Sequence, residues 1–260
     1  MATYKRRMAH IFREDGRALI VAMDHGSQGP MRGLEQPGRI LDEVVEGGAD
    51  AILTSLGIAT AFIRKIERCG LIVRMDGGSG FGTPEVHAWQ RYPVSDAVAI
   101  GADAVGCMGL IGWPCEAENL RYMTQLTSEC LRTGMPLMVE TMPFSDTVPG
   151  PDLAGGVAKG ARMAAEFGAD LVKTTYTGNP DTFRVVVEST FVPVVILGGP
   201  KVDSDEQLLA MVREALQAGA SGVAFGRNIW QHPAPGKLVR ALAAVVHEDA
   251  RPEQAAKLIR

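Results

Sequence analysis

Short apolar runs recur along the whole chain, and none of them alternates with polar residues. Continuous apolar character is typical of strands that are buried on both faces of a parallel sheet. The stretches between the runs are long enough for crossover helices. The pattern therefore predicts eight strands, at residues 18–23, 51–56, 71–75, 104–108, 136–141, 170–176, 192–197 and 222–225.

Four of the intervening stretches have a helical spacing of apolar residues and end at glycine, the usual residue after a helix. They cover residues 40–48, 116–134, 155–168 and 204–219. Every second strand opens with a related lead-in, GGADAIL, GADAVGC, GADLVKT or GASGVAF, as in a barrel assembled from double units. The charged segment after His247 is a last helix or a tail. We predict a single-domain (β/α)8 barrel over residues 1–260.

Length and composition agree with this prediction. The chain has 260 residues, and parallel α/β barrels commonly use about 250 residues as one domain. With 46% apolar and 22% charged residues and no Pro- or Ser-rich linker, it does not belong to the disordered, collagen-like or coiled-coil classes. A formal charge of -4 offers no basic field to a nucleic-acid backbone, so we predict no nucleic-acid partner.

The beginning of the chain carries no pattern of a membrane or secretion signal. Residues 1–17 are basic and polar, and the apolar run at 18–23 is far shorter than the roughly 20 residues of a membrane span. The four cysteines lack CxxC spacing, which suits reduced thiols. We expect a cytoplasmic protein that has no membrane partner.

No group of side chains has the spacing of a metal or cofactor site. A metal would have to bind through His25, Asp76, His87 and Glu140 across the rim of the barrel, and no motif supports that set. We predict no metal and no cofactor.

Lys173 is the most informative polar residue, because it lies inside a predicted strand. In (β/α)8 barrels the active site lies at the carboxyl ends of the strands. Period-two alternation places Lys173 on the same face as Leu171, so both point into the barrel if Leu171 does. Burial would lower the pKa of the lysine and leave a free amine, which can attack a carbonyl carbon and form an iminium. The alternative is a lysine paired with a carboxylate at the rim.

Asp24 follows the first predicted strand and shares its inward face with Ile20 and Ala22. A carboxylate there can take the proton of a substrate hydroxyl, which retro-aldol cleavage requires. The alternative role is a helix N-cap or an Asx turn that closes the loop. His25 comes next in the chain, and we assign it to substrate binding at the same rim.

Glu140 lies in the strand at 136–141, on the face that also carries Met138 and Met142. A carboxyl group buried among methionines has a raised pKa and can act as an acid. The alternative is an ion pair with Arg74 or Lys173.

Glycine-rich turns follow the last two predicted strands, LGGPK at 197–201 and FGRN at 225–228. Glycines let backbone N–H groups approach an anion, and loops seven and eight of such barrels are the usual phosphate site. A cation in each turn adds attraction. The predicted phosphate-binding residues are Gly198, Gly199, Lys201, Gly226 and Arg227.

Four motifs together resemble the archaeal-type class I fructose-bisphosphate aldolases, among the DeoC/LacD-like barrel aldolases. The motifs are DHG at 24–26, GADLVKTTYTG at 168–178, VVILGGPK at 194–201 and GVAFGRNIWQH at 222–232. The resemblance runs from about residue 18 to 246, and relatives include the aminodideoxyheptulosonate synthases and the autoinducer-2 phosphate thiolase. It implies a Schiff-base lysine at Lys173, an acid/base Asp24, phosphate binding through Gly199, Gly226 and Arg227, and ring-shaped homo-oligomers such as decamers.

This chain departs from the family at one position. The aldolases and synthases carry a Tyr-Pro pair after the fifth strand, where the tyrosine serves as acid/base, whereas this chain has Met142 and Pro143. Methionine cannot transfer a proton. We predict that Glu140 takes the tyrosine's role; Tyr176 is the competitor, but alternation places it on the opposite face from Lys173.

These observations predict a class I aldolase that acts on a phosphorylated keto sugar or a related carbonyl compound. Two alternatives remain open. One is a lysine-dependent thiolase or acyl transferase on a phosphorylated diketone, and the other is a phosphosugar-binding barrel that has lost catalysis.

Overall fold

Eight parallel strands close into a barrel in the computed structural model, which describes residues 5–29, 31–77, 89–142, 153–199, 202 and 204–260. Each predicted apolar run forms one of these strands, which confirms the predicted barrel. In spatial order the strands are β1 (Ala18–Ala22), β10 (Gly222–Phe225), β9 (Val194–Leu197), β8 (Leu171–Thr175), β7 (Leu137–Thr141), β6 (Ala104–Gly109), β3 (Gly70–Arg74) and β2 (Ala51–Ser55).

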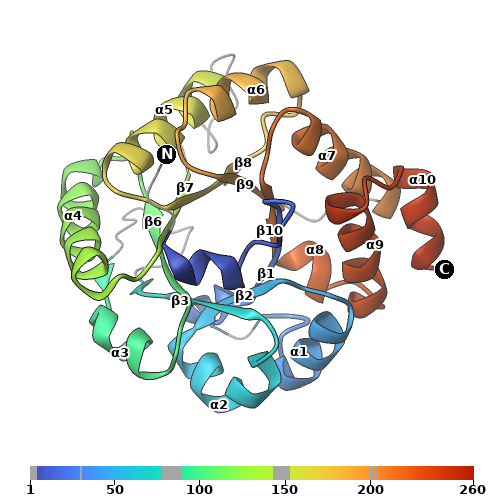
Figure 1. Ribbon diagram of the computed structural model, residues 1–260, viewed down its shortest axis with the longest axis horizontal. Helices are drawn as coiled ribbons and strands as arrows, with labels where there is room; N and C mark the ends of the chain where they lie inside the picture. Colours follow the sequence, from blue (N-terminus) through green and yellow to red (C-terminus); the bar gives the residue numbers. More distant parts are fainter. Residues whose placement is uncertain (1–4, 30, 78–88, 143–152, 200–201, 203) are drawn as a thin grey trace.

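Helices surround the barrel as an outer ring (Figure 1). The four predicted helices are present, and the segment after His247 is helical rather than a tail. The helices are α1 (Pro37–Glu46), α2 (Leu56–Ile66), α3 (Val94–Ala99), α4 (Glu116–Thr133), α5 (Leu153–Glu166), α6 (Pro180–Glu188), α7 (Asp205–Gln217), α8 (Arg227–Trp230), α9 (Pro235–His247), α10 (Pro252–Ala255) and η4 (Ala256–Leu258). The apolar pattern did not predict a small antiparallel pair, β4 (Asp76–Gly77) and β5 (Trp89–Gln90).

Side chains of the barrel strands alternate between two apolar layers, as period-two geometry requires. The outward layer packs against the helices, and the inward layer fills the barrel. Leu171 belongs to the inward layer, so Lys173, two residues later on β8, lies on the inward face as predicted. The inward layer includes Ile20, Leu53, Ile72, Met138, Leu171 and Val195.

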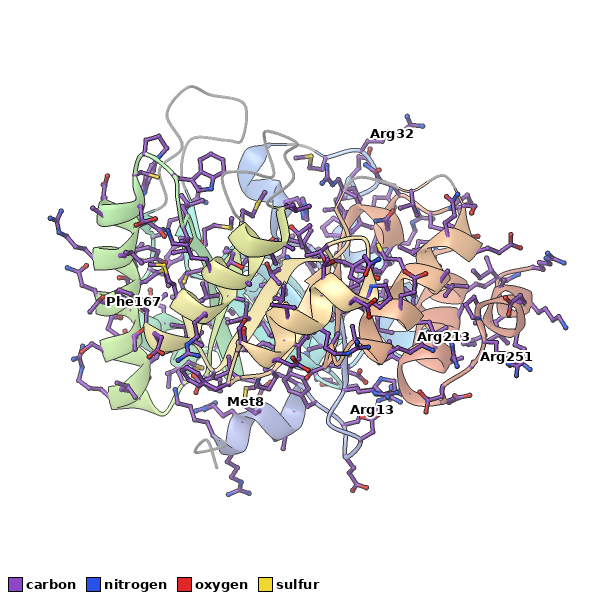
Figure 2. The ribbon with its side chains drawn as sticks, turned by 90° about the horizontal axis from the view of Figure 1, so that it is seen from above. Met8, Arg13, Arg32, Phe167, Arg213 and Arg251 are labelled. Carbon is purple, nitrogen blue, oxygen red and sulfur yellow. The ribbon has the colours of Figure 1, made fainter. Side chains whose placement is uncertain are left out.

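A short N-terminal 3-10 helix, η1 (Arg6–His10), closes the amino end of the barrel. Figure 1 shows it inside the ring of strands, and Figure 2 shows it at one end of the molecule, beside the label of Met8. Met8, Ile11 and Phe12 join the inward apolar layer. The fit is close at Gly70, where a Cβ would lie 2.4 Å from the His10 carbonyl oxygen. This N-terminal segment is therefore part of the barrel core.

Three aspartates of the GAD lead-ins hold the N-terminal segment in place. The contacts are Lys5 with Asp170 (2.8 Å), His10 with Asp103 (2.5 Å) and Arg13 with Asp50 (2.5 Å). Each carboxylate also accepts a backbone N–H from an adjacent strand, from Leu137, Leu71 and Leu19 respectively. The repeated lead-in thus supplies a repeated anchor at the amino end of the barrel.

Candidate active site

Lys173 and Glu140 lie side by side at the carboxyl end of the barrel. They are paired residues of the neighbouring strands β8 and β7. The Lys173 Nζ lies 2.9 Å from Glu140 Oε1, and the lysine side chain is only 4% exposed. The ion pair that was the alternative role of both Lys173 and Glu140 is therefore present. It also places a carboxylate oxygen directly on the lysine nitrogen.

Arg74 connects this pair to Asp24 across the barrel. It alternates with Ile72 on β3, so it points inward. Its Nε donates to Asp24 Oδ2 at 2.7 Å, and its Nη2 donates to Glu140 Oε2. Asp24, Arg74, Glu140 and Lys173 thus form one buried series of alternating charges, which we call the charge chain.

The charge chain sets the ionisation of its two carboxylates. Burial alone would raise both pKa values. For Asp24, the nearby positive charges of Arg74 and Lys173 outweigh burial and hold the pKa well below its usual range. For Glu140, Lys173 and Arg74 likewise lower the pKa. The prediction of a raised pKa for Glu140 is therefore wrong. Arg74 and Lys173 contact its two oxygens, and their positive charges outweigh the effect of burial.

Asp76 is a fifth ionisable group at this site, and the strand pattern does not indicate a role for it. It is buried, its Oδ2 accepts the Met108 N–H at 2.6 Å, and its Oδ1 lies 3.7 Å from Arg74 Nη1. Burial raises the pKa of Asp76 to about 6, although Arg74 and the Met108 N–H act in the opposite direction. Unlike Asp24 and Glu140, it therefore titrates near neutral pH.

Asp24 and His25 lie at the start of the 3-10 helix η2 (Asp24–Gln28). Asp24 Oδ1 and His25 Nδ1 are 3.6 Å apart, and neither has a hydrogen-bond partner within the described part of the chain. The His25 ring contacts Trp230 edge to face, with ring centroids 5.4 Å apart. Burial lowers the pKa of His25, so the imidazole is neutral at pH 7. One buried carboxylate oxygen and one buried ring nitrogen thus have no hydrogen-bond partner among the described residues.

The turns after β9 and β10 meet, as predicted for a phosphate site. Arg227 Nη2 donates to the Gly199 carbonyl at 3.0 Å, and Asn228 Nδ2 donates to the Gly198 carbonyl at 2.8 Å. Gly226 admits no side chain, since a Cβ there would lie 2.7 Å from the His25 ring. The structure therefore brings Gly198, Gly199, Gly226 and Arg227 together beside His25, while Lys201 lies outside the described residues.

Tyr176 lies outside the barrel, as alternation predicted. Its hydroxyl donates to Glu214 Oε2 at 3.0 Å, and its ring packs against Phe183. Met142 follows β7, and its carbonyl accepts the Trp113 indole N–H at 2.6 Å. Tyr176 therefore does not contact Lys173, whereas the Glu140 carboxylate does.

The described residues contain no group of three His, Cys, Asp or Glu side chains arranged to hold a metal. His87, one member of the set that a metal would have required, lies outside the residues that the structure describes.

Comparisons with known proteins identify the family. Residues 18–232 match the DeoC/LacD family aldolases. The chain is 37% identical to an uncharacterized aldolase of Saccharolobus solfataricus, with 98% of each chain covered. It is 36% identical to the 2-amino-3,7-dideoxy-D-threo-hept-6-ulosonate synthase of Halobacterium salinarum, with 93% of this chain and 91% of that one covered.

A solved structure extends the comparison to the fold. An archaeal fructose-1,6-bisphosphate aldolase, with its catalytic Lys covalently bound to the carbinolamine intermediate of the substrate, superposes with a TM-score of 0.85. Its sequence is 32% identical, and the match covers 93% of this chain and 98% of that one. The chain therefore belongs to the DeoC/LacD aldolase family and is a class I, Schiff-base-forming aldolase, a lyase.

Proposed function

We propose that Lys173 is the lysine that forms the Schiff base, and that the substrate is a phosphorylated keto sugar. The observation that carries this proposal is the contact of Lys173 Nζ with Glu140 Oε1 at the inward, carboxyl end of β8. An amine must lose a proton before it attacks a carbonyl carbon, and Glu140 is in place to accept it.

Glu140 moves the protons of Schiff-base formation. It takes a proton from the Lys173 ammonium, and the neutral amine attacks the carbonyl carbon of the substrate to give a carbinolamine. Glu140 then returns the proton to the carbinolamine hydroxyl, which leaves as water and yields the iminium. Because Glu140 Oε1 already contacts Nζ, no side chain has to move before the first transfer.

Asp24 serves the cleavage step. Its low pKa keeps it ionised, and its Oδ1 is free of the Arg74 contact. This oxygen accepts the proton of the substrate hydroxyl while the carbon–carbon bond breaks and its electron pair moves into the iminium, giving an enamine and an aldehyde. Protonation of the enamine carbon and hydrolysis then release the ketone product and restore Lys173.

The substrate's phosphate binds at the turns after β9 and β10. Arg227 supplies a guanidinium, and Gly198, Gly199 and Gly226 let the backbone approach the anion closely. Lys201, two residues after Gly199 in the sequence, adds a positive charge. His25 lies between this site and Asp24 and binds a hydroxyl of the substrate.

Borohydride reduction tests the proposal. Protein mixed with fructose 1,6-bisphosphate and sodium borohydride should gain a stable adduct, and peptide mass spectrometry should locate it on Lys173. Lys173→Met should abolish the adduct and turnover, whereas Lys159→Met, which removes an exposed lysine of α5, should change neither. An adduct on another lysine would overturn the assignment, and equal trapping of unphosphorylated fructose would contradict the phosphate site.

Substrate consumption, measured beside the trapping, separates the two alternative functions. A thiolase or acyl transferase would consume a phosphorylated diketone faster than a phosphorylated keto sugar. A barrel that only binds phosphosugars would bind them without forming any reducible adduct.

We further propose that the chain works as one catalytic domain in the cytoplasm and as a homo-oligomer. All four cysteines are free thiols, and no helix among the described residues is long and apolar enough to span a membrane. Leu131, Val185 and Phe191 are more than half exposed, and we propose them as residues of the subunit interface. Light scattering coupled to size-exclusion chromatography measures the number of subunits.

A further inference from the structure

Arg74 faces three carboxylates but bonds to only two of them. Its Nε and Nη2 are engaged by Asp24 and Glu140. Its Nη1 is buried and has no hydrogen-bond partner within the described ranges, and Asp76 Oδ1 lies 3.7 Å away. A buried guanidinium N–H without a partner is costly, so a shift that satisfies Nη1 is favourable.

Asp76 cannot move away from this position easily. It is 3% exposed, and its other oxygen is fixed by the Met108 N–H of the neighbouring strand β6 at 2.6 Å. Arg74, in contrast, is held by hydrogen bonds to the side chains of Asp24 and Glu140 and not by the backbone. A movement of the guanidinium of about 1 Å would turn the 3.7 Å approach into a hydrogen bond.

We propose that Asp76 is a positioning residue that acts through Arg74: it takes over the guanidinium when Glu140 accepts the proton of Lys173. This inference rests on the proposed function. Proton transfer turns the Lys173 ammonium and the Glu140 carboxylate into an amine and a carboxylic acid. Arg74 then loses one of its two charged partners, and Asp76 is the carboxylate within reach of its unused Nη1. Asp76 thereby stabilises the protonated form of Glu140.

The charges around Asp76 support this role. Asp24 and Glu140 repel a negative charge on Asp76, so neutralising Glu140 favours the ionised form of Asp76. Among the described residues, the ionisable groups that act on it are Arg74 on β3, Asp24 after β1, Glu140 on β7, Cys107 on β6 and Tyr122 on α4. Of these groups Arg74 carries a positive charge, and the Arg91 guanidinium lies against Gly77, the next residue in the chain.

Asp76→Asn tests the proposal, because asparagine keeps an acceptor for the Met108 N–H and removes the charge. We expect the rate of iminium trapping and kcat to fall about tenfold, the effect of one pKa unit, with KM unchanged. The wild-type pH profile of kcat should show a step near pH 6 that the variant lacks, since the pKa of Asp76 is about 6. An unchanged trapping rate and an unchanged pH profile would overturn the proposal.

Two further variants separate positioning from stability. Asp170→Asn is the matched control: this carboxylate also accepts a backbone N–H from an adjacent strand and pairs with a cation, but at the amino end of the barrel. It should leave the pH profile unchanged. Arg74→Lys keeps a cation but removes Nη1, so it should abolish the step near pH 6 although Asp76 is present; a retained step overturns the proposal even if Asp76→Asn fails to fold. Absence of any adduct in the wild-type protein would instead reject the proposed function itself.

Discussion

The two ends of the barrel hold their charges differently. At the amino end, Asp50, Asp103 and Asp170 each bind a backbone N–H as well as a side chain of the N-terminal segment. At the carboxyl end, Asp24 and Glu140 are bound by the side chains of Arg74 and Lys173. The amino-end carboxylates join the N-terminal segment to the strands and so stabilise the fold, whereas Asp24 and Glu140, held by side-chain cations, can exchange protons and partners. Changes at the carboxyl end should therefore alter kinetics, and changes at the amino end should alter stability.

The largest expected effect comes from Glu140→Gln. This variant keeps the shape of the side chain but cannot accept the proton of Lys173, so kcat should fall by about 10²-fold or more, the range of a lost acid/base group. Steady-state kinetics measures the loss, and slow borohydride trapping should still mark Lys173. Near-normal kcat would show that water or a substrate phosphate oxygen carries the proton.

Arg227→Ala should have the next largest effect. Removing a charged hydrogen bond to the phosphate costs roughly 1.5 to 3 kcal/mol, so KM should rise by about tenfold or more, with a smaller change in kcat. The comparison substrate is the unphosphorylated sugar, whose KM should not change. If both substrates lose affinity equally, Arg227 acts by joining the two turns through the Gly199 carbonyl and not by binding phosphate.

Asp170→Asn tests how much the charges at the amino end of the barrel contribute to stability. The asparagine oxygen still accepts the Leu137 N–H, but the ion pair with Lys5 is lost. Because both side chains are partly exposed, the free energy of unfolding should fall by only about 1 kcal/mol. Urea denaturation gives this value, and kcat should remain at the wild-type level. A large loss of kcat would contradict the division between the two ends.

His247 should give the smallest effect, a pH dependence of stability. It contacts Asp50 and Asp15; burial alone would lower its pKa, but the hydrogen bonds to these two carboxylates raise it. A raised pKa in the folded state means that the stabilisation is complete below the ordinary histidine value of about 6.5 and is lost as the pH rises through the folded value. Tm should therefore decline over this range in the wild type and decline less in His247→Gln.

The fold could be predicted from local patterns, because a strand buried on both faces must be continuously apolar. The same reasoning places Lys173 inside the barrel and Tyr176 outside it. The lead-in glycines likewise predict where helices end. None of these inferences needs knowledge of a partner that is distant in the sequence.

The charge chain could not be predicted in the same way. Alternation tells which face Arg74 occupies, but not that it contacts Asp24, 50 residues earlier, and Glu140, 66 residues later. The strand neighbours Met138 and Met142 predict a raised pKa for Glu140. The side chains that lower this pKa, Lys173 and Arg74, come from other strands. The GAD repeat indicates a turn, but its aspartates carry no sign of their N-terminal partners.

The N-terminal segment also affects how the chain folds. Lys5 and Asp170 are 165 residues apart in the sequence, and β1 pairs with β10. During synthesis the first strand and its preceding segment leave the ribosome long before the partners that cover them exist. An intermediate that lacks β10 exposes an open strand edge and the apolar side chains of Met8, Ile11 and Phe12, a surface prone to aggregation. Closure of the barrel is therefore a late, long-range step, and nascent chains of this protein should depend on chaperones until it is complete.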